Sequence, residues 1–160
     1  MSHRPRPAAR VAASAGALAA SVLLAACGYG GSSSSALRQW VSQNSFLSNE
    51  RQVLADAHSL HLAVEKGSAI QLRTVCGGLS SDAGTLYGTL PTPNHPLTDE
   101  LGASMVDFFH AAESCAVAPS TGGRATTRAL SDLRRGMTEL ASARRTLASF
   151  GIRSPEPPRG

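Results

Sequence analysis

The sequence predicts an all-α protein, an antiparallel four-helix bundle that follows an apolar N-terminal segment and a flexible Gly/Ser tether. Apolar residues recur at steps of three and four through most of the 160-residue chain, and the alternating pattern of half-buried strands does not recur. Turn-forming stretches such as "PTPNHP" at 91–96 separate the periodic segments. Hydrophobic residues make up 42% of the chain and aromatic residues only 4%, which predicts an aliphatic, Ala-rich core.

The first 26 residues have the order of a secretory signal. "MSHRPRPAAR" carries three arginines and no acid, and the 16 residues of "VAASAGALAASVLLAA" are fewer than the roughly 20 that a spanning helix needs. Without this segment the chain keeps 12 basic and 11 acidic side chains, so its net charge of +4 does not indicate nucleic-acid binding. Lys66 is the only Lys, and this preference for Arg is typical of GC-rich genomes such as those of actinobacteria.

A cysteine ends the apolar run. The motif "LAAC", residues 24–27, precedes "GYGGSSSSA" and resembles the lipobox of bacterial lipoproteins, which is an aliphatic residue, two small residues and an invariant Cys. The resemblance implies that the Cys27 thiol receives a diacylglyceryl group and that residues 1–26 are removed. Two or more acyl chains would then hold the protein on the extracytoplasmic face of the cell membrane. Residues 27–36 would form the lipidated Cys and its tether, whose last nine residues span roughly 17 Å as a coil. The alternative is a chance Cys in a cleaved peptide or a signal anchor.

The two remaining cysteines, Cys76 and Cys115, are an even pair in what would be an oxidising compartment, and a disulfide between them is expected. Both lie on the apolar seams of neighbouring helices. They lie roughly 21 and 26 Å from the turn at 91–96 along an antiparallel hairpin, because a helix rises 1.5 Å per residue. The alternative is two free, buried thiols.

The bundle domain is expected over 37–150, followed by a disordered tail at 151–160. Helices are expected at about 36–66, with a break at Asn44 and Ser45, and at 68–90, 98–117 and 124–150. Thr98 is expected to cap the third of these segments, and "NERQ" at 49–52 has the spacing of a capping box. The inward positions expected in the last helix are Leu130, Leu133, Met137, Leu140 and Leu147.

The third expected helix is acidic and the fourth is rich in Arg. Folding the two helices back on each other aligns three pairs, each worth about 0–1 kcal/mol if exposed: Arg135 with Asp107, Arg128 with Glu113, and Arg144 with Asp99. The alternative use of this arginine-rich helix is a surface for an anionic lipid or glycan.

Three glycines of the second expected helix, Gly77, Gly84 and Gly88, share one face, where a neighbouring backbone could approach closely. Trp40 is expected to cap the bundle, with a position at the membrane interface as the alternative.

Candidate chemistry is sparse. His58 and His61 lie three apart with Glu65 four beyond, a spacing that could hold Zn or Cu, but these positions fall 80–140° from the apolar stripe and are expected at the surface. The pair His110 and Glu113 reverses the order of the di-iron motif. The sequence contains no G-x-S-x-G elbow and no Gly-rich phosphate loop, so neither an enzyme nor a cofactor is predicted.

The sequence therefore predicts a lipid-anchored cell-envelope protein that acts as a non-catalytic structural or interaction module. Its expected partners are the membrane, through Cys27, and an envelope protein or lipid, with no nucleic acid. One alternative is a carrier that holds a small hydrophobic ligand inside the bundle. A metal-handling protein that uses His58 and His61 is the weaker alternative.

Overall fold

The computed structural model describes residues 34–66, 69–121 and 123–154 of the chain. Within this part every regular element is a helix, and no strand is present, so the predicted all-α class is confirmed. The helices are α1 (Ser34–Gln43), α2 (Phe46–Lys66), α3 (Ala69–Tyr87), α4 (His95–Thr121) and α5 (Gly123–Ser149). The signal segment, Cys27 and the first residues of the expected tether lie outside the described residues.

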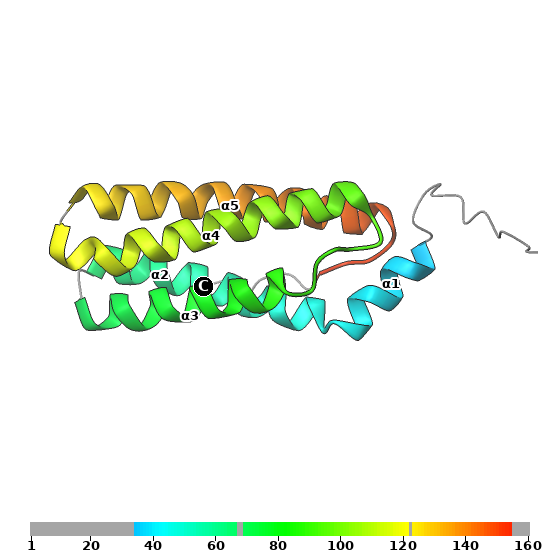
Figure 1. The fold of residues 1–160 in the computed structure, drawn as a ribbon, viewed down its shortest axis with the longest axis horizontal. Coiled ribbons are helices and arrows are strands. Elements are labelled where there is room, and N and C mark those ends of the chain that lie inside the picture. Colours follow the sequence, from blue (N-terminus) through cyan, green and yellow to red (C-terminus); the bar gives the residue numbers. More distant parts are fainter. Residues whose placement is uncertain (1–33, 67–68, 122, 155–160) are drawn as a thin grey trace, which may run out of the picture.

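The four long helices lie side by side, and α1 extends from one end of them (Figure 1). Neighbours along the chain pack against each other, and the contact between α4 and α5 is the most extensive. The helices bury a continuous aliphatic core that contains few aromatic rings. Its largest fully buried side chains include Phe46, Phe108, Leu60, Leu79, Leu101, Met105, Leu140 and Leu147.

The break between α1 and α2 lies at Asn44 and Ser45, as predicted. Ser45 has a left-handed backbone with φ 49°, and the Asn44 side chain donates a hydrogen bond to the carbonyl oxygen of Trp40 at 2.9 Å. Because α2 already begins at Phe46, the capping box expected at 49–52 is wrong. Glu50 instead lies inside α2 and is buried.

Trp40 closes one end of the core, as expected. Its indole is 7% exposed and lies 5.1 Å from the ring of Phe46, measured between centroids. The indole N–H donates to the carbonyl oxygen of Thr89 at 3.0 Å, which satisfies its polar end. α1 is thereby tied to the loop that follows α3.

Helix α4 begins at His95 and not at the predicted cap Thr98. Asn94 is the cap, because its side-chain oxygen accepts a hydrogen bond from the backbone N–H of Leu97 at 2.9 Å. Pro96 is tolerated in the first turn because its missing N–H would have no partner within the helix. Thr98 Oγ1 lies 3.0 Å from Thr92 Oγ1 and braces the loop from within the helix.

Gly136 marks the closest approach between α4 and α5. A β-carbon added there would lie 2.8 Å from two ring carbons of Phe108 and 3.1 Å from the backbone oxygen of Ser104. The Ser104 hydroxyl donates to the Gly136 carbonyl oxygen at 2.8 Å. The close approach expected on α3 is wrong: a β-carbon on Gly77 would meet no atom within 4 Å, and one on Gly84 would meet only the ring of Phe109, at 4.0 Å.

The boundaries and the inner face of the last helix also differ from expectation. α1 begins at Ser34, inside the expected tether, and Ile152, inside the expected tail, packs into the core at 7% exposure. Met137 is 38% exposed, so its predicted inward position is wrong. Asp132 and Gly136 are buried on this helix instead.

Candidate functional site

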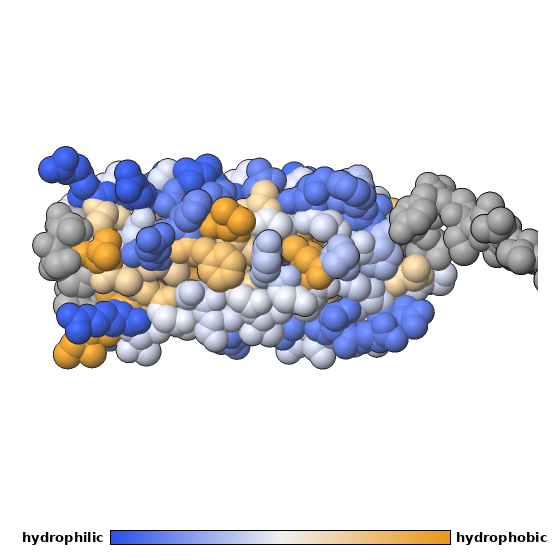
Figure 2. All heavy atoms as spheres, in the orientation of Figure 1, coloured by the Kyte–Doolittle hydropathy of each residue, from blue (hydrophilic) through white to orange (hydrophobic). Residues whose placement is uncertain are grey.

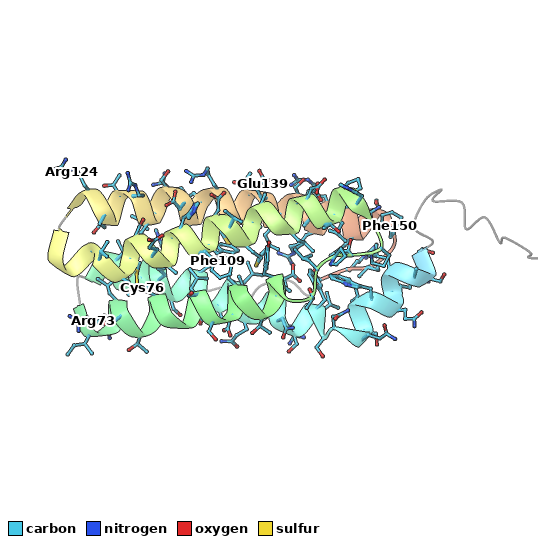
Figure 3. All side chains as sticks on the ribbon, viewed as in Figure 1. Arg73, Cys76, Phe109, Arg124, Glu139 and Phe150 are labelled. Carbon is cyan, nitrogen blue, oxygen red and sulfur yellow. A yellow bond between two sulfur atoms is a disulfide. The ribbon has the colours of Figure 1, made fainter. Side chains whose placement is uncertain are left out.

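Cys76 and Cys115 form the predicted disulfide. Cys76 lies on α3 and Cys115 on α4, both are buried, and their Cα atoms are 5.9 Å apart (Figure 3 labels Cys76). The bond fixes the register of α3 against α4 and shields both sulfur atoms from solvent. Cys27, the third cysteine, lies outside the described residues.

Polar contacts tie α4 to α5 along their length. Arg135 Nη2 lies 3.1 Å from Asp107 Oδ1, which confirms that predicted pair, and Arg135 also contacts Asp132 on its own helix. Glu100 accepts hydrogen bonds at 2.8 Å from two hydroxyls of α5, those of Ser142 and Thr146. The hydrogen bond to Asp107, and to a smaller extent the one to Asp132, raises the pKa of Arg135.

The pairing predicted for Arg128 and Glu113 is not present. Both side chains line an open groove between α4 and α5, but no ion pair joins them within the described residues. The register from the turn is correct, as Arg135 and Asp107 show. Side chains at the same height can nevertheless point to different sides of the groove.

An ion pair with a buried carboxylate joins α2 to α5, two helices that are not consecutive in the chain. Glu50 on α2 is 1% exposed, and its Oε1 lies 3.2 Å from Nε of Arg144 on α5. The pairing predicted between Arg144 and Asp99 is therefore wrong, and Asp99 Oδ2 instead lies 3.0 Å from His95 Nδ1. Burial raises the pKa of Glu50, while the Ser154 hydroxyl and then the positive charges of Arg144 and Arg51 oppose that shift.

Glu50 was missed by the sequence argument, although a signal existed. It occupies one position of the apolar stripe that continues along α2 at steps of three and four through Phe46, Val53, Ala57 and Leu60, all of which are buried. A carboxylate in such a stripe requires a partner inside the core.

Two carboxyl groups face each other between α2 and α3. Burial, and then hydrogen bonding to and repulsion by the neighbouring Asp82 carboxyl, together raise the pKa of Asp56 to about 6. Gly78 provides the space, because a β-carbon there would lie 3.1 Å from Asp56 Oδ2.

The histidines predicted at the surface are exposed. His58 and His61 both point outward from α2, and the side chain of Glu65, the third member of the expected trio, lies outside the described part. Among the described residues no group of three or more His, Cys, Asp or Glu side chains could hold a metal ion.

The outer side of α5 carries five exposed arginines, which we call the arginine face: Arg124, Arg128, Arg134, Arg135 and Arg145. Figure 2 shows hydrophilic side chains along the upper edge of the molecule, where α5 lies in Figure 1. The seam between α3 and α4 is more apolar, and there Tyr87 and Phe109 meet edge to face with their ring centroids 6.2 Å apart.

Comparison with known proteins gives no relative: no protein-family model, no curated protein and no solved structure matches this chain. Of the helices in the described ranges, none combines the length and the apolar character needed to span a bilayer.

Proposed function

We propose that this chain is a lipid-anchored cell-envelope protein whose helical domain acts as a non-catalytic structural or interaction module. The observation that carries the proposal is the disulfide between Cys76 and Cys115, because such bonds persist in oxidising compartments and are rare in the cytosol. This disulfide contains two of the three cysteines, so that Cys27, in the lipobox-like "LAAC", remains for acylation. The first described helix begins only seven residues after Cys27.

The long helices α2 to α5 are proposed to form one antiparallel four-helix bundle. Sequential packing of α2 on α3, α3 on α4 and α4 on α5 supports three sides of such a bundle. The ion pair of Glu50 and Arg144 supports the fourth side, because it reaches across the core from α2 to α5. Short connections between successive helices favour this up-and-down order.

The packing of the interior favours a structural or interaction module over a carrier. Core side chains from all five helices and Ile152 are nearly solvent-free, and at Gly136 there is no room for one additional carbon atom. A carrier of small hydrophobic ligands would need an enclosed space of several hundred Å³ lined by apolar side chains. Hollows lined by described residues include open grooves on the surface, such as the one between α4 and α5.

Metabolic labelling with an alkyne fatty acid tests the anchor. The full chain is expected to take up the label and to lose its first 26 residues. Cys27→Ala should take up no label and remain a precursor, whereas the double variant Cys76→Ser, Cys115→Ser should still be labelled. Labelling of Cys27→Ala at the level of the parent would contradict the anchor.

Native mass spectrometry of the acylated chain tests the carrier alternative. The module predicts a single mass that is explained by the chain and its covalent lipids. Stoichiometric copurification of a further hydrophobic molecule would contradict the module and favour the carrier.

A further inference from the structure

The arginine face places five arginines along one side of α5. Arg124, the first of its five residues, lies 21 residues before Arg145, the last, which corresponds to about 31 Å along the axis of α5. At 100° per residue all five fall within an arc of about 120°, centred opposite the buried side of the helix. Figure 3 shows Arg124 projecting from α5 on the side of the molecule away from Arg73 of α3.

Most of this charge is not neutralised within the molecule. Arg135 alone pairs with acids, those of Asp107 and Asp132. The other four arginines of the face form no ion pair with any acid in the described part of the chain. An exposed pair with the nearby Glu113 would have removed one charge, but it does not form.

The other side chains on this arc suit contact with phosphate. Three exposed hydroxyl residues, Thr127, Ser131 and Thr138, alternate with the arginines, and Thr127 and Ser131 line an open groove together with Arg124 and Arg128. Guanidinium groups bind phosphate oxygens through two parallel hydrogen bonds, and hydroxyls can add further donors. The arc carries no large apolar side chain, so this surface would rest on headgroups and not insert among acyl chains.

The position of the anchor places this face within reach of a bilayer. α1 and the C-terminal end of α5 lie at the same end of the molecule, where Arg38 Nη2 donates to the carbonyl oxygen of Phe150 at 3.4 Å (Figure 1). The chain from Cys27 to Ser34 can span at most about 25 Å. A lipid on Cys27 would therefore hold the Arg145 end of the face close to the headgroups, with α5 free to lie along them.

We propose that the arginine face docks on the anionic phospholipid headgroups of the membrane that carries the anchor, so that the domain lies on its side along α5. The proposal rests on the proposed function for the location of the bilayer. The anchor favours a membrane over an anionic polymer because it raises the local concentration of headgroups. Each basic residue at an anionic bilayer strengthens binding roughly fivefold, so the four unpaired arginines together supply a gain of several hundredfold.

Arginine-specific labelling with phenylglyoxal tests the orientation of the full, acylated chain in vesicles. In vesicles with about 30% phosphatidylglycerol, Arg124, Arg128, Arg134 and Arg145 should react at least about threefold more slowly than in pure phosphatidylcholine vesicles. Arg73, an exposed arginine of α3, should react at the same rate in both. About 0.5 M NaCl, where the Debye length falls to roughly 4 Å, should restore the fast rates.

Two charge-matched variants separate the face from net charge. Arg128→Gln, Arg134→Gln, Arg145→Gln should abolish the protection of Arg124. The control Arg51→Gln, Arg73→Gln, Arg153→Gln removes the same charge from exposed positions outside the face and should preserve that protection.

Equal rates in both vesicles, or equal slowing at Arg73, would overturn the proposal. Protection by a soluble anionic polymer but not by phosphatidylglycerol would overturn it in favour of a polymer partner. Failure of the proposed anchor would give a different result: the N-terminal peptide would lack the mass of acyl chains, and the protein would not float with phosphatidylcholine vesicles. Failure of the docking proposal alone would leave the protein bound to vesicles while its arginines react at equal rates.

Discussion

Gly136→Ala and Gly77→Ala are the same substitution inside two helices, and the structure predicts opposite effects on stability. Ala is favoured over Gly in a helix by about 1 kcal/mol, and this gain applies to both positions. At Gly77 nothing opposes it, because the added carbon would meet no atom within 4 Å. Gly77→Ala should therefore raise the free energy of unfolding by about 1 kcal/mol.

At Gly136 the added carbon collides with α4. It would lie 2.8 Å from the ring of Phe108, which is fully buried, and 3.1 Å from the backbone oxygen of Ser104. Overpacking of this kind costs about 1–3 kcal/mol, and moving the helices apart also weakens the hydrogen bond from Ser104, worth about 1 kcal/mol. After the gain in helix propensity, Gly136→Ala should lower the free energy of unfolding by about 2 kcal/mol.

Thermal unfolding of the oxidised protein, followed by far-UV circular dichroism, measures both variants. For a domain of this size the melting temperature should fall by roughly 6–10 °C for Gly136→Ala and rise by roughly 3–5 °C for Gly77→Ala. Adding Phe108→Leu to Gly136→Ala should recover about 1 kcal/mol relative to additivity, because the smaller side chain removes the collision. A Gly136→Ala protein as stable as the parent would refute the close approach of α4 and α5.

Three further predictions concern the covalent and ionised groups of the core. Reduction of the disulfide between α3 and α4 opens a loop of about 40 residues and should cost about 4 kcal/mol in chemical denaturation; a change below about 1 kcal/mol would contradict it. Asp82→Asn should lower the pKa of Asp56 from about 6 towards its usual 3.8. A carboxyl group whose pKa is raised in the folded state loses stabilisation as the pH rises from 3.8 to about 6. Lowering that pKa should therefore raise the free energy of unfolding on the order of 1 kcal/mol at pH 7.5, after allowance for solvent screening, and change it little at pH 4. An equal gain at both pH values would contradict the raised pKa of Asp56. Arg144→Met should lose about 3–5 kcal/mol at pH 7.5 because it leaves a buried carboxylate without its counter-ion, whereas Glu50→Gln should change stability by less than about 1 kcal/mol; equal losses would contradict the buried ion pair.

The features that the sequence predicted correctly depend on spacing along the chain. The helices follow from apolar periodicity, and the break at Ser45 follows from the interruption of that pattern. Cys76 with Cys115, and Arg135 with Asp107, lie on hairpins whose turns are short, so counting residues from the turn gives their heights. Counting residues gives the height of such positions but does not decide contact, because Arg128 and Glu113, counted from the same turn, form no ion pair within the described residues.

The features that the sequence did not predict depend on which faces meet. Gly136 and Gly77 are both glycines inside helices, and the sequence does not distinguish them. Only the distance to the atoms packed against each glycine decides whether a β-carbon can be accommodated. Glu50 and Arg144 lie on helices that share no turn, so no count of residues could align them. Asn94 lies in the stretch 91–96 that the sequence predicts as a turn, although Pro96 fits the first turn of the helix that Asn94 caps.

The contacts between α4 and α5 also explain why the arginine face remains charged. Four of the acids of this hairpin are engaged: Glu100 accepts two hydroxyls, Asp107 and Asp132 both contact Arg135, and Asp99 contacts His95. The contacts of Glu100 and Asp107 with α5 lie where the two helices meet, on either side of the close approach at Gly136. Apart from Arg135, which pairs with Asp107, the arginines of the arginine face form no ion pair with a described acid of α4. The tight packing that stabilises the hairpin therefore also leaves a positively charged surface available to an anionic partner.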